Sequence, residues 1–208
     1  MTPTMLLRAG PVTGFLFVVL SIAGLAIHGY PANSQDAVKK WVATTDPTRF
    51  AIGIWLEAFA FMLFLVFAAW LVRTHRRPGV PRWPADVAMG SAVLATGSAI
   101  LVNGVWTAVL DSGRAGIDSG PLYAVRVVAQ DTFNASLFFY AVFALGVAVL
   151  ARLGNAPPRW LSWLAAAVGI LMLIPLTASA AILVFYIWIL AVSLLALRRR
   201  PELEIENP

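Results

Sequence analysis

Long apolar runs follow one another along this chain, separated by short polar segments. A run over residues 50–72 carries a single charged side chain, Glu57. Each run is long enough to cross about 30 Å of hydrocarbon, which takes roughly 20 helical residues. The pattern predicts an all-α, polytopic membrane protein. Four further runs contain no Asp, Glu, Lys or Arg: residues 9–35, 87–110, 132–151 and 160–197.

The last of these runs must fold back on itself. It holds 38 residues, and one straight helix of that length would extend about 57 Å, nearly twice the hydrocarbon thickness. Pro175 and the small polar residues after it mark the turn. Residues 201–208 are predicted to form a disordered acidic tail. A single domain of six transmembrane helices is predicted within residues 1–200, over 11–29, 50–72, 84–110, 123–153, 160–176 and 180–197.

Two segments between these helices are polar. Residues 30–49 are expected to form a loop with one short surface helix, and residues 111–122 a loop that contains Gly and Ser. In the third predicted helix, glycine recurs every seven residues at Gly90, Gly97 and Gly104. Small residues let membrane helices approach closely, so this helix is predicted to be the central one in the bundle.

The basic residues indicate how the helices are oriented. With six spans and an internal N-terminus, ten of the 15 Lys and Arg residues fall in the inner segments. Short cytoplasmic segments carry an excess of these residues. Both termini are therefore predicted to be cytoplasmic, in the cytoplasmic (inner) membrane of a bacterium. Five spans would instead place the basic residues Arg198, Arg199 and Arg200 outside.

Composition excludes several classes of function. The chain is 60% hydrophobic and 12% charged, whereas soluble domains are about 25% charged. Its net charge of +5 comes from basic residues at the ends of apolar runs, so nucleic acid is not an expected partner. The chain has no cysteine, and its only histidines are His28 and His75. Disulfides, thiolate chemistry and a histidine-ligated di-haem site are excluded, and no metal or cofactor is predicted.

Glu57 is the most informative residue, because a carboxylate inside the bilayer usually faces a bundle interior or a water-filled cavity. With the predicted orientation, nearly every intramembrane polar residue falls in the outer half of the bilayer. Three of them, Arg126, Gln130 and Asn134, share one helix face. We predict a cavity that opens to the outer side or laterally to the outer leaflet. Its polar residues are Glu57, Asn103, Arg126, Gln130, Asp131 and Asn134, and its aromatic residues are Phe61, Trp106 and Tyr140.

Two interpretations of these residues stay open. In the functional one, Glu57 and Asp131 are candidate catalytic acids and the other seven bind a ligand, with Arg126 paired to one of the two acids. In the structural one, the amides and Glu57 only hydrogen-bond between helices, while Arg126 and Asp131 lie at the headgroup level. His28 is expected to be an interfacial residue rather than a ligand.

Three short motifs carry a resemblance to a known family. They are Arg8-Ala9-Gly10-Pro11-Val12-Thr13-Gly14-Phe15-Leu16, Arg49-Phe50 and Pro158-Arg159-Trp160-Leu161. The chain resembles a family of small bacterial membrane proteins of unknown function, which implies six spans and no particular activity. It is more loosely similar to integral-membrane terpene cyclases. That similarity implies Glu57 as proton donor to an isoprenoid, with Phe61, Trp106 and Tyr140 stabilising cations.

Three functions are therefore carried forward. The first is binding of a small or amphiphilic molecule in the outer-half pocket, in a transport-accessory, sensing or immunity role. The second is an acid-catalysed cyclase of isoprenoids. The third is a structural membrane subunit. The lipid bilayer is the one partner common to all three.

Overall fold

The computed structural model describes residues 3–30, 33–154, 158–174 and 177–198, and these residues form helices and no strands. This confirms the predicted all-α class. The predicted tail 201–208 and the turn at Pro175 lie outside the described residues. The helices are α1 (Pro3–His28), α2 (Gln35–Thr44), α3 (Pro47–His75), α4 (Trp83–Arg114), α5 (Ser119–Leu153), α6 (Arg159–Leu173) and α7 (Ala178–Arg198).

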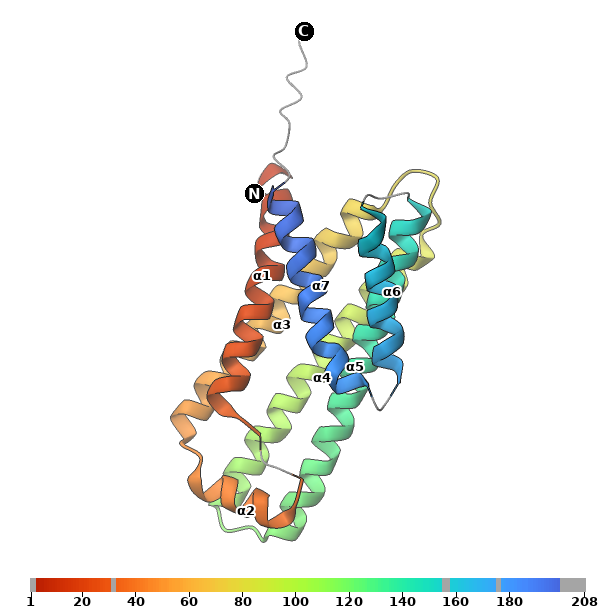
Figure 1. The fold of residues 1–208 in the computed structure, drawn as a ribbon. Coiled ribbons are helices and arrows are strands. Elements are labelled where there is room, and N and C mark those ends of the chain that lie inside the picture. The colour runs from red at the N-terminus through yellow and green to blue at the C-terminus, as the bar shows by residue number, and fades with distance from the viewer. Residues whose placement is uncertain (1–2, 31–32, 155–157, 175–176, 199–208) are drawn as a thin grey trace.

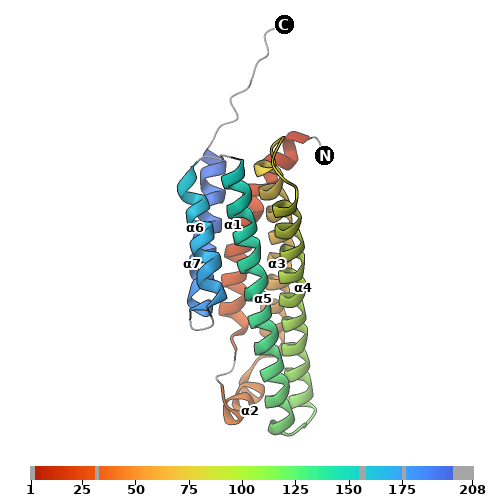
Figure 2. The same ribbon diagram turned by 90° about the vertical axis from the view of Figure 1, so that its right-hand side faces the viewer.

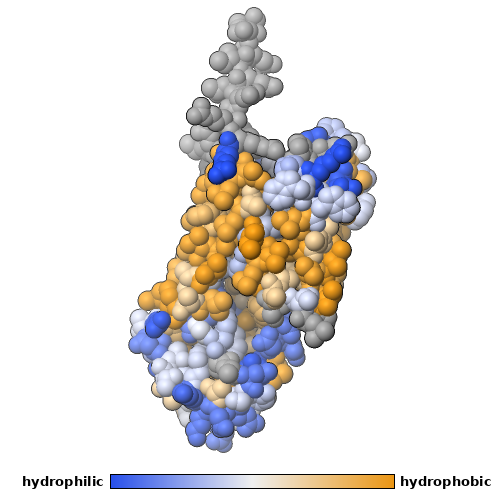
Figure 3. Space-filling model, viewed as in Figure 1, coloured by the Kyte–Doolittle hydropathy of each residue, from blue (hydrophilic) through white to orange (hydrophobic). Residues whose placement is uncertain are grey.

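Five of these helices are long and apolar enough to cross a membrane: α1, α3, α4, α5 and α7. They run along one common direction in the bundle (Figures 1 and 2). Hydrophobic side chains cover the upper and middle parts of the face shown in Figure 3, between hydrophilic groups at both ends. The chain is thus a multi-pass membrane protein by helix length and composition. Helix α6, with 15 residues, is shorter than a usual span.

Several helices extend beyond the predicted bounds, including the start of α1 at Pro3 and both helices at the end of the bundle that holds α2. Helix α4 continues to Arg114 and α5 begins at Ser119, so the predicted loop 111–122 is reduced to residues 115–118. The prediction ended the helix at the first charge, Asp111, whereas backbone hydrogen bonding continues past it. Helices of 32 and 35 residues exceed the roughly 20 that cross the hydrocarbon, so their ends project from it.

The surface helix expected within residues 30–49 is α2, and it lies across the end of the bundle (Figure 1). Ser34 caps its first turn by accepting a hydrogen bond from the backbone N–H of Ala37 at 3.1 Å. Its apolar face, with Val38 and Val42 buried, packs against the ends of α4 and α5. Asp46 then caps α3 through the N–H of Arg49 at 2.7 Å.

Two closely packed helix pairs, α1 with α3 and α4 with α5, are joined along α3 and α4. Helix α6 covers α5, and α7 lies between α6 and α1. In the described part of the chain α1 and α5 do not pack against each other. Both views show that the α6–α7 hairpin stops well short of α2 (Figures 1 and 2). Helix α1 ends at about the same level as the hairpin, above α2 (Figure 1).

An aromatic core fills the bundle alongside α7. The Phe64 ring lies 5.1 Å from the rings of Tyr140 and Phe143 and 6.1 Å from that of Phe185, between centroids. Phe64, Phe143 and Phe185 are fully buried. Edge-on and tilted aromatic pairs of this kind add to the packing between α3, α5 and α7. Tyr140, a member of this core, also lines the cavity described in the next section.

Glycine brings α1 and α3 together, at positions that the sequence pattern did not single out. A Cβ on Gly24 would lie 2.8 Å from the carbonyl oxygen of Gly53, and a Cβ on Gly53 would lie 2.9 Å from that of Gly24. The stripe of Gly90, Gly97 and Gly104 is different, since a Cβ there would meet nothing within 4 Å. The prediction that these glycines pack helices within the bundle is wrong, because α4 buries its alanines and turns this stripe outward.

Two glycine-to-alanine substitutions test whether α1 and α3 approach each other closely at Gly24. Gly24→Ala must push α1 away from the α3 backbone, so we expect it to lower the free energy of unfolding by about 1–3 kcal/mol. Gly97→Ala is the matched control and should leave stability unchanged or raise it, because alanine favours the helix by about 1 kcal/mol. Thermal unfolding in mild detergent measures both. Equal midpoints for the two variants would contradict the close approach.

Candidate functional site

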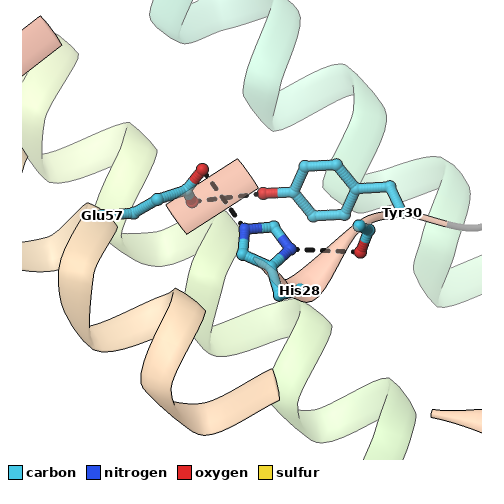
Figure 4. A network of polar contacts seen from close by, with 4 residues as sticks. His28, Tyr30 and Glu57 are labelled. Carbon is cyan, nitrogen blue, oxygen red and sulfur yellow. Dashed lines mark hydrogen bonds and ion pairs between the residues drawn. The ribbon is translucent and has the colours of Figure 1, made fainter. Parts of the chain in front are cut away.

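Glu57 lies at the contact between α1 and α3 and is 6% exposed. Figure 4 shows its carboxyl group between two side chains from the end of α1. The imidazole Nε2 of His28 lies 3.2 Å from Oε1, and the hydroxyl of Tyr30 donates to Oε2 at 3.4 Å. The carboxyl group is therefore enclosed by partners on both oxygens, as expected for an acid inside a membrane protein.

His28, expected to be an interfacial residue, has its side chain fully buried against Glu57. The reason is the turn that follows it. Gly29 ends α1 with a φ of 58°, a conformation that glycine adopts without strain. The chain then folds back, so Tyr30 packs its ring 4.6 Å from that of His28, between centroids. The sequence His28-Gly29-Tyr30 at the end of a predicted helix could have indicated this turn.

Both ring nitrogens of His28 face oxygen atoms. Its Nδ1 lies 3.1 Å from the carbonyl oxygen of Gly29, and its Nε2 lies 3.2 Å from Oε1 of Glu57. The contact with Oε1 is within ion-pair distance but lacks hydrogen-bond geometry, and Nε2 has no other partner among the described residues. The imidazole and the carboxyl group therefore lie side by side at the contact between α1 and α3.

Tyr30 completes this cluster as a hydrogen-bond donor. Burial, together with the neighbouring Glu57, raises the pKa of the Tyr30 phenol above its usual range. The hydroxyl therefore keeps its proton at physiological pH. Its ring also lies 5.0 Å from that of Trp106, between centroids, which links the end of α1 to α4.

A cavity of about 270 Å³ lies beside this cluster, at the level where the α6–α7 hairpin stops. Its walls come from α1, α3, α4, α5 and the start of α7, and they are mainly aromatic and aliphatic. One lining residue, Leu25 of α1, is 47% exposed. The lining residues are Ser21, Leu25, Tyr30, Glu57, Phe61, Ala99, Val102, Asn103, Trp106, Arg126, Ala129, Gln130, Phe133, Ser136, Tyr140, Ile182 and Tyr186.

Most of the residues singled out from the sequence face this one space. Seven of the nine line the cavity: Glu57, Phe61, Asn103, Trp106, Arg126, Gln130 and Tyr140. The other two do not. Asp131 is exposed, because it lies about 100° around α5 from Gln130. Asn134 is also exposed, and its Oδ1 accepts a hydrogen bond from Nε2 of Gln130 at 3.3 Å.

Arg126 does not form either of the ion pairs expected from the sequence. Its side chain is 7% exposed, and Nη1 donates to Oδ1 of Asn33 in the segment before α2. Among the described residues it makes no ion pair with Asp131 or Glu57. Its Nε has no hydrogen-bond partner in the described part of the chain. A guanidinium group is thus held at the cavity wall by a neutral amide.

Two further polar side chains at the cavity wall lack partners within the described chain. Asn103 is 3% exposed and its Nδ2 has no partner, and the hydroxyl of Tyr140, also 3% exposed, has none. Buried polar groups are nearly always hydrogen-bonded, so an unpartnered one requires an explanation. Within the described residues, no hydrogen bond joins the side chain of Asn103, Gln130 or Asn134 to another helix. These amides therefore do not hydrogen-bond one helix to another, as the structural interpretation proposed.

Sequence reasoning missed part of the wall. Phe133 and Ser136 lie on the same face of α5 as Arg126, at helical spacing that could have identified them. Ile182 and Tyr186 come from α7 and reach the cavity only because the hairpin ends there. Within the described residues no group of three His, Asp or Glu side chains could hold a metal ion.

Comparisons of the chain with known protein families, with curated proteins and with solved structures give no match.

A double-mutant cycle tests the His28–Glu57 contact. Glu57→Gln should lower the free energy of unfolding by about 2 kcal/mol, because it removes the carboxyl group that contacts His28 and accepts the hydrogen bond from Tyr30. His28→Phe keeps the ring contacts and should cost a similar amount. The double variant should lose clearly less than the sum of the two, as measured by denaturant unfolding in mild detergent. Asp131→Asn, an exposed acid on α5, is the control and should change stability by less than about 0.5 kcal/mol. Additive losses would show that the two groups do not interact.

Proposed function

We propose that this membrane protein binds a small or amphiphilic molecule in the cavity beside Glu57. The observation that carries the proposal is a set of buried polar atoms at the cavity wall, on Asn103, Arg126 and Tyr140, that find no partner among the described residues. Desolvated donors of this kind are costly unless something hydrogen-bonds to them. Ligand sites are typically apolar cavities with a few well-placed polar groups, and this cavity has that composition.

Access from the side supports an amphiphilic ligand. Leu25 of α1 lines the cavity and is 47% exposed, and α1 does not pack against α5 in the described part of the chain. A molecule dissolved in the bilayer would enter beside Leu25 without crossing the polar end of the bundle. A transport-accessory, sensing or immunity role is consistent with such a site, and the fold does not distinguish among the three.

A second candidate is acid-catalysed cyclisation of an isoprenoid, favoured by one observation. The carboxyl group of Glu57 shares the cavity with the aromatic rings of Phe61, Trp106 and Tyr140. Binding is the better-supported function, because both oxygens of Glu57 are already engaged by His28 and Tyr30. The second predicted acid, Asp131, also lies outside the cavity wall.

We also propose six membrane crossings with both termini in the cytoplasm of a bacterial cell. The start of α1 and the end of α7 lie at the same end of the bundle, opposite α2 (Figure 1). That end carries Arg152, whose guanidinium lies 4.3 Å from the centre of the Trp163 ring. Arginine and tryptophan together are typical of the membrane interface, and the excess of basic residues favours the cytoplasmic side. In this arrangement α6 is the short sixth crossing.

Single cysteines test this topology directly, since the chain has none of its own. Ala43→Cys, exposed on α2, should react with a membrane-impermeant maleimide in intact cells. Pro78→Cys, exposed between α3 and α4, should react only after the cells are opened. Labelling is measured by the mass shift of the purified protein. The reverse pattern would show that the orientation is inverted.

Filling the cavity tests the proposed binding. Ala99 is 5% exposed and lines the cavity, so Ala99→Phe should occupy the ligand's space. Native mass spectrometry of protein extracted in mild detergent should show a bound small molecule on the wild type and a loss of most of it in the variant. Ala108→Phe is the matched control, because Ala108 lies on the exposed side of α4 and outside the cavity.

Either of two results would overturn the proposal. One is a wild-type protein that carries no bound molecule and binds none of a panel of amphiphiles added to it. The other is equal occupancy in the Ala99→Phe and Ala108→Phe variants, with both variants unfolding at the wild-type temperature.

A further inference from the structure

The cavity is elongated, and its two ends differ in chemistry. Along α5 its wall runs from Arg126 to Tyr140, fourteen positions that correspond to about 21 Å of helix. Arg126 and Asn103 lie toward the end that α2 covers. Phe61, Tyr140 and Ile182 form the other end, deeper in the bundle. A molecule that fits this space has a polar head and one apolar tail.

Arg126 forms no ion pair at the polar end. The carboxyl group of Glu57 also lines the cavity, but its two oxygens contact His28 and Tyr30. Asp131 is exposed and outside the cavity wall. Arg126 faces the cavity with only the neutral side chain of Asn33 as a partner among the described residues. The polar end therefore presents a buried cation without an ionic partner in the described part of the chain.

The unpartnered groups at this end are hydrogen-bond donors. Nε of Arg126 and Nδ2 of Asn103 are both without partners in the described residues, and neither nitrogen can accept a hydrogen bond. Because Nη1 donates to Asn33, the edge of the guanidinium formed by Nε and Nη2 remains available to donate hydrogen bonds to a ligand. That edge matches a carboxylate or a phosphate, whose two oxygens accept in parallel. A neutral or cationic head group would leave the charge uncompensated.

We infer that the cavity binds an anionic amphiphile with a single apolar chain. Its carboxylate or phosphate accepts hydrogen bonds from Arg126 and Asn103, and its chain extends toward Phe61, Tyr140 and the start of α7. This inference rests on the proposed function and adds the charge and the orientation of the ligand. The cavity of about 270 Å³ is slightly smaller than most ligand sites, which suits one chain rather than two.

Three amphiphiles with the same chain test the inference. Dodecanoate, dodecanol and dodecyl phosphate are radiolabelled, and their equilibrium binding is measured on wild-type protein in phosphatidylcholine nanodiscs, with empty nanodiscs subtracted. We expect at least one of the two anions to bind more tightly than dodecanol. In Arg126→Gln the affinity for that anion should fall roughly ten- to hundredfold, the range for a lost charge-assisted hydrogen bond. Dodecanol binding should change less than about twofold in the same variant.

The matched control is Arg49→Gln, which removes the same charge from an exposed residue near the start of α3 that does not line the cavity. It should bind all three amphiphiles as the wild type does. Dodecanoate binding more tightly than dodecyl phosphate would support the anionic site with a carboxylate head, and the reverse would support it with a phosphate head. Equal losses in the two variants would overturn the inference, because a general surface charge would then explain the binding.

The outcomes separate this inference from the proposed function. If the wild type binds none of the three probes, both are overturned. If dodecanol binds as tightly as either anion and Arg126→Gln weakens none of them, the cavity binds amphiphiles and the anionic class is wrong. Asn103→Leu serves if Arg126→Gln does not fold. It should weaken anion binding roughly three- to tenfold by removing a donor, and wild-type affinity in that variant would overturn the inference.

Discussion

The backbone contact between α1 and α3 at Gly24 and Gly53 is the constraint on which the rest of the site depends. Helices that meet without intervening side chains hold their ends in a fixed register. That register places His28 and Tyr30, at the end of one helix, directly over Glu57 on the other. Glu57 itself supplies part of the contact, since its Cγ lies against Gly24. The acid is therefore part of the helix packing as well as part of the cavity wall.

The two ionisable residues at the cavity wall have different surroundings. An ionised group in the hydrocarbon region is costly unless a partner compensates it. Glu57 has His28 and Tyr30 against its two oxygens. Arg126 has only the neutral side chain of Asn33, which orients the guanidinium without cancelling its charge. The sequence presents Glu57 and Arg126 as potential partners, but in the structure each contacts other residues.

Sequence reasoning found the helices and much of the cavity wall, because both follow from periodicity. Glu57 with Phe61, and Arg126 with Gln130, share faces at helical spacing, and their common depth follows from where each helix begins. The burial of His28 was not predictable in this way, because it depends on a turn at Gly29. The sequence also did not show that Gly90, Gly97 and Gly104 face outward. Lipid-facing and buried residues are equally apolar in a membrane helix, so hydropathy does not distinguish inside from outside.

The place of α7 at the cavity wall has a further consequence. Helix α7 supplies Ile182 and Tyr186, whereas Asn103 and Arg126 lie on α4 and α5. Substitutions near the start of α7 would therefore change the size of the apolar end and leave the polar side chains in place. In the proposed site, the length of the bound chain and the choice of head group would then evolve independently.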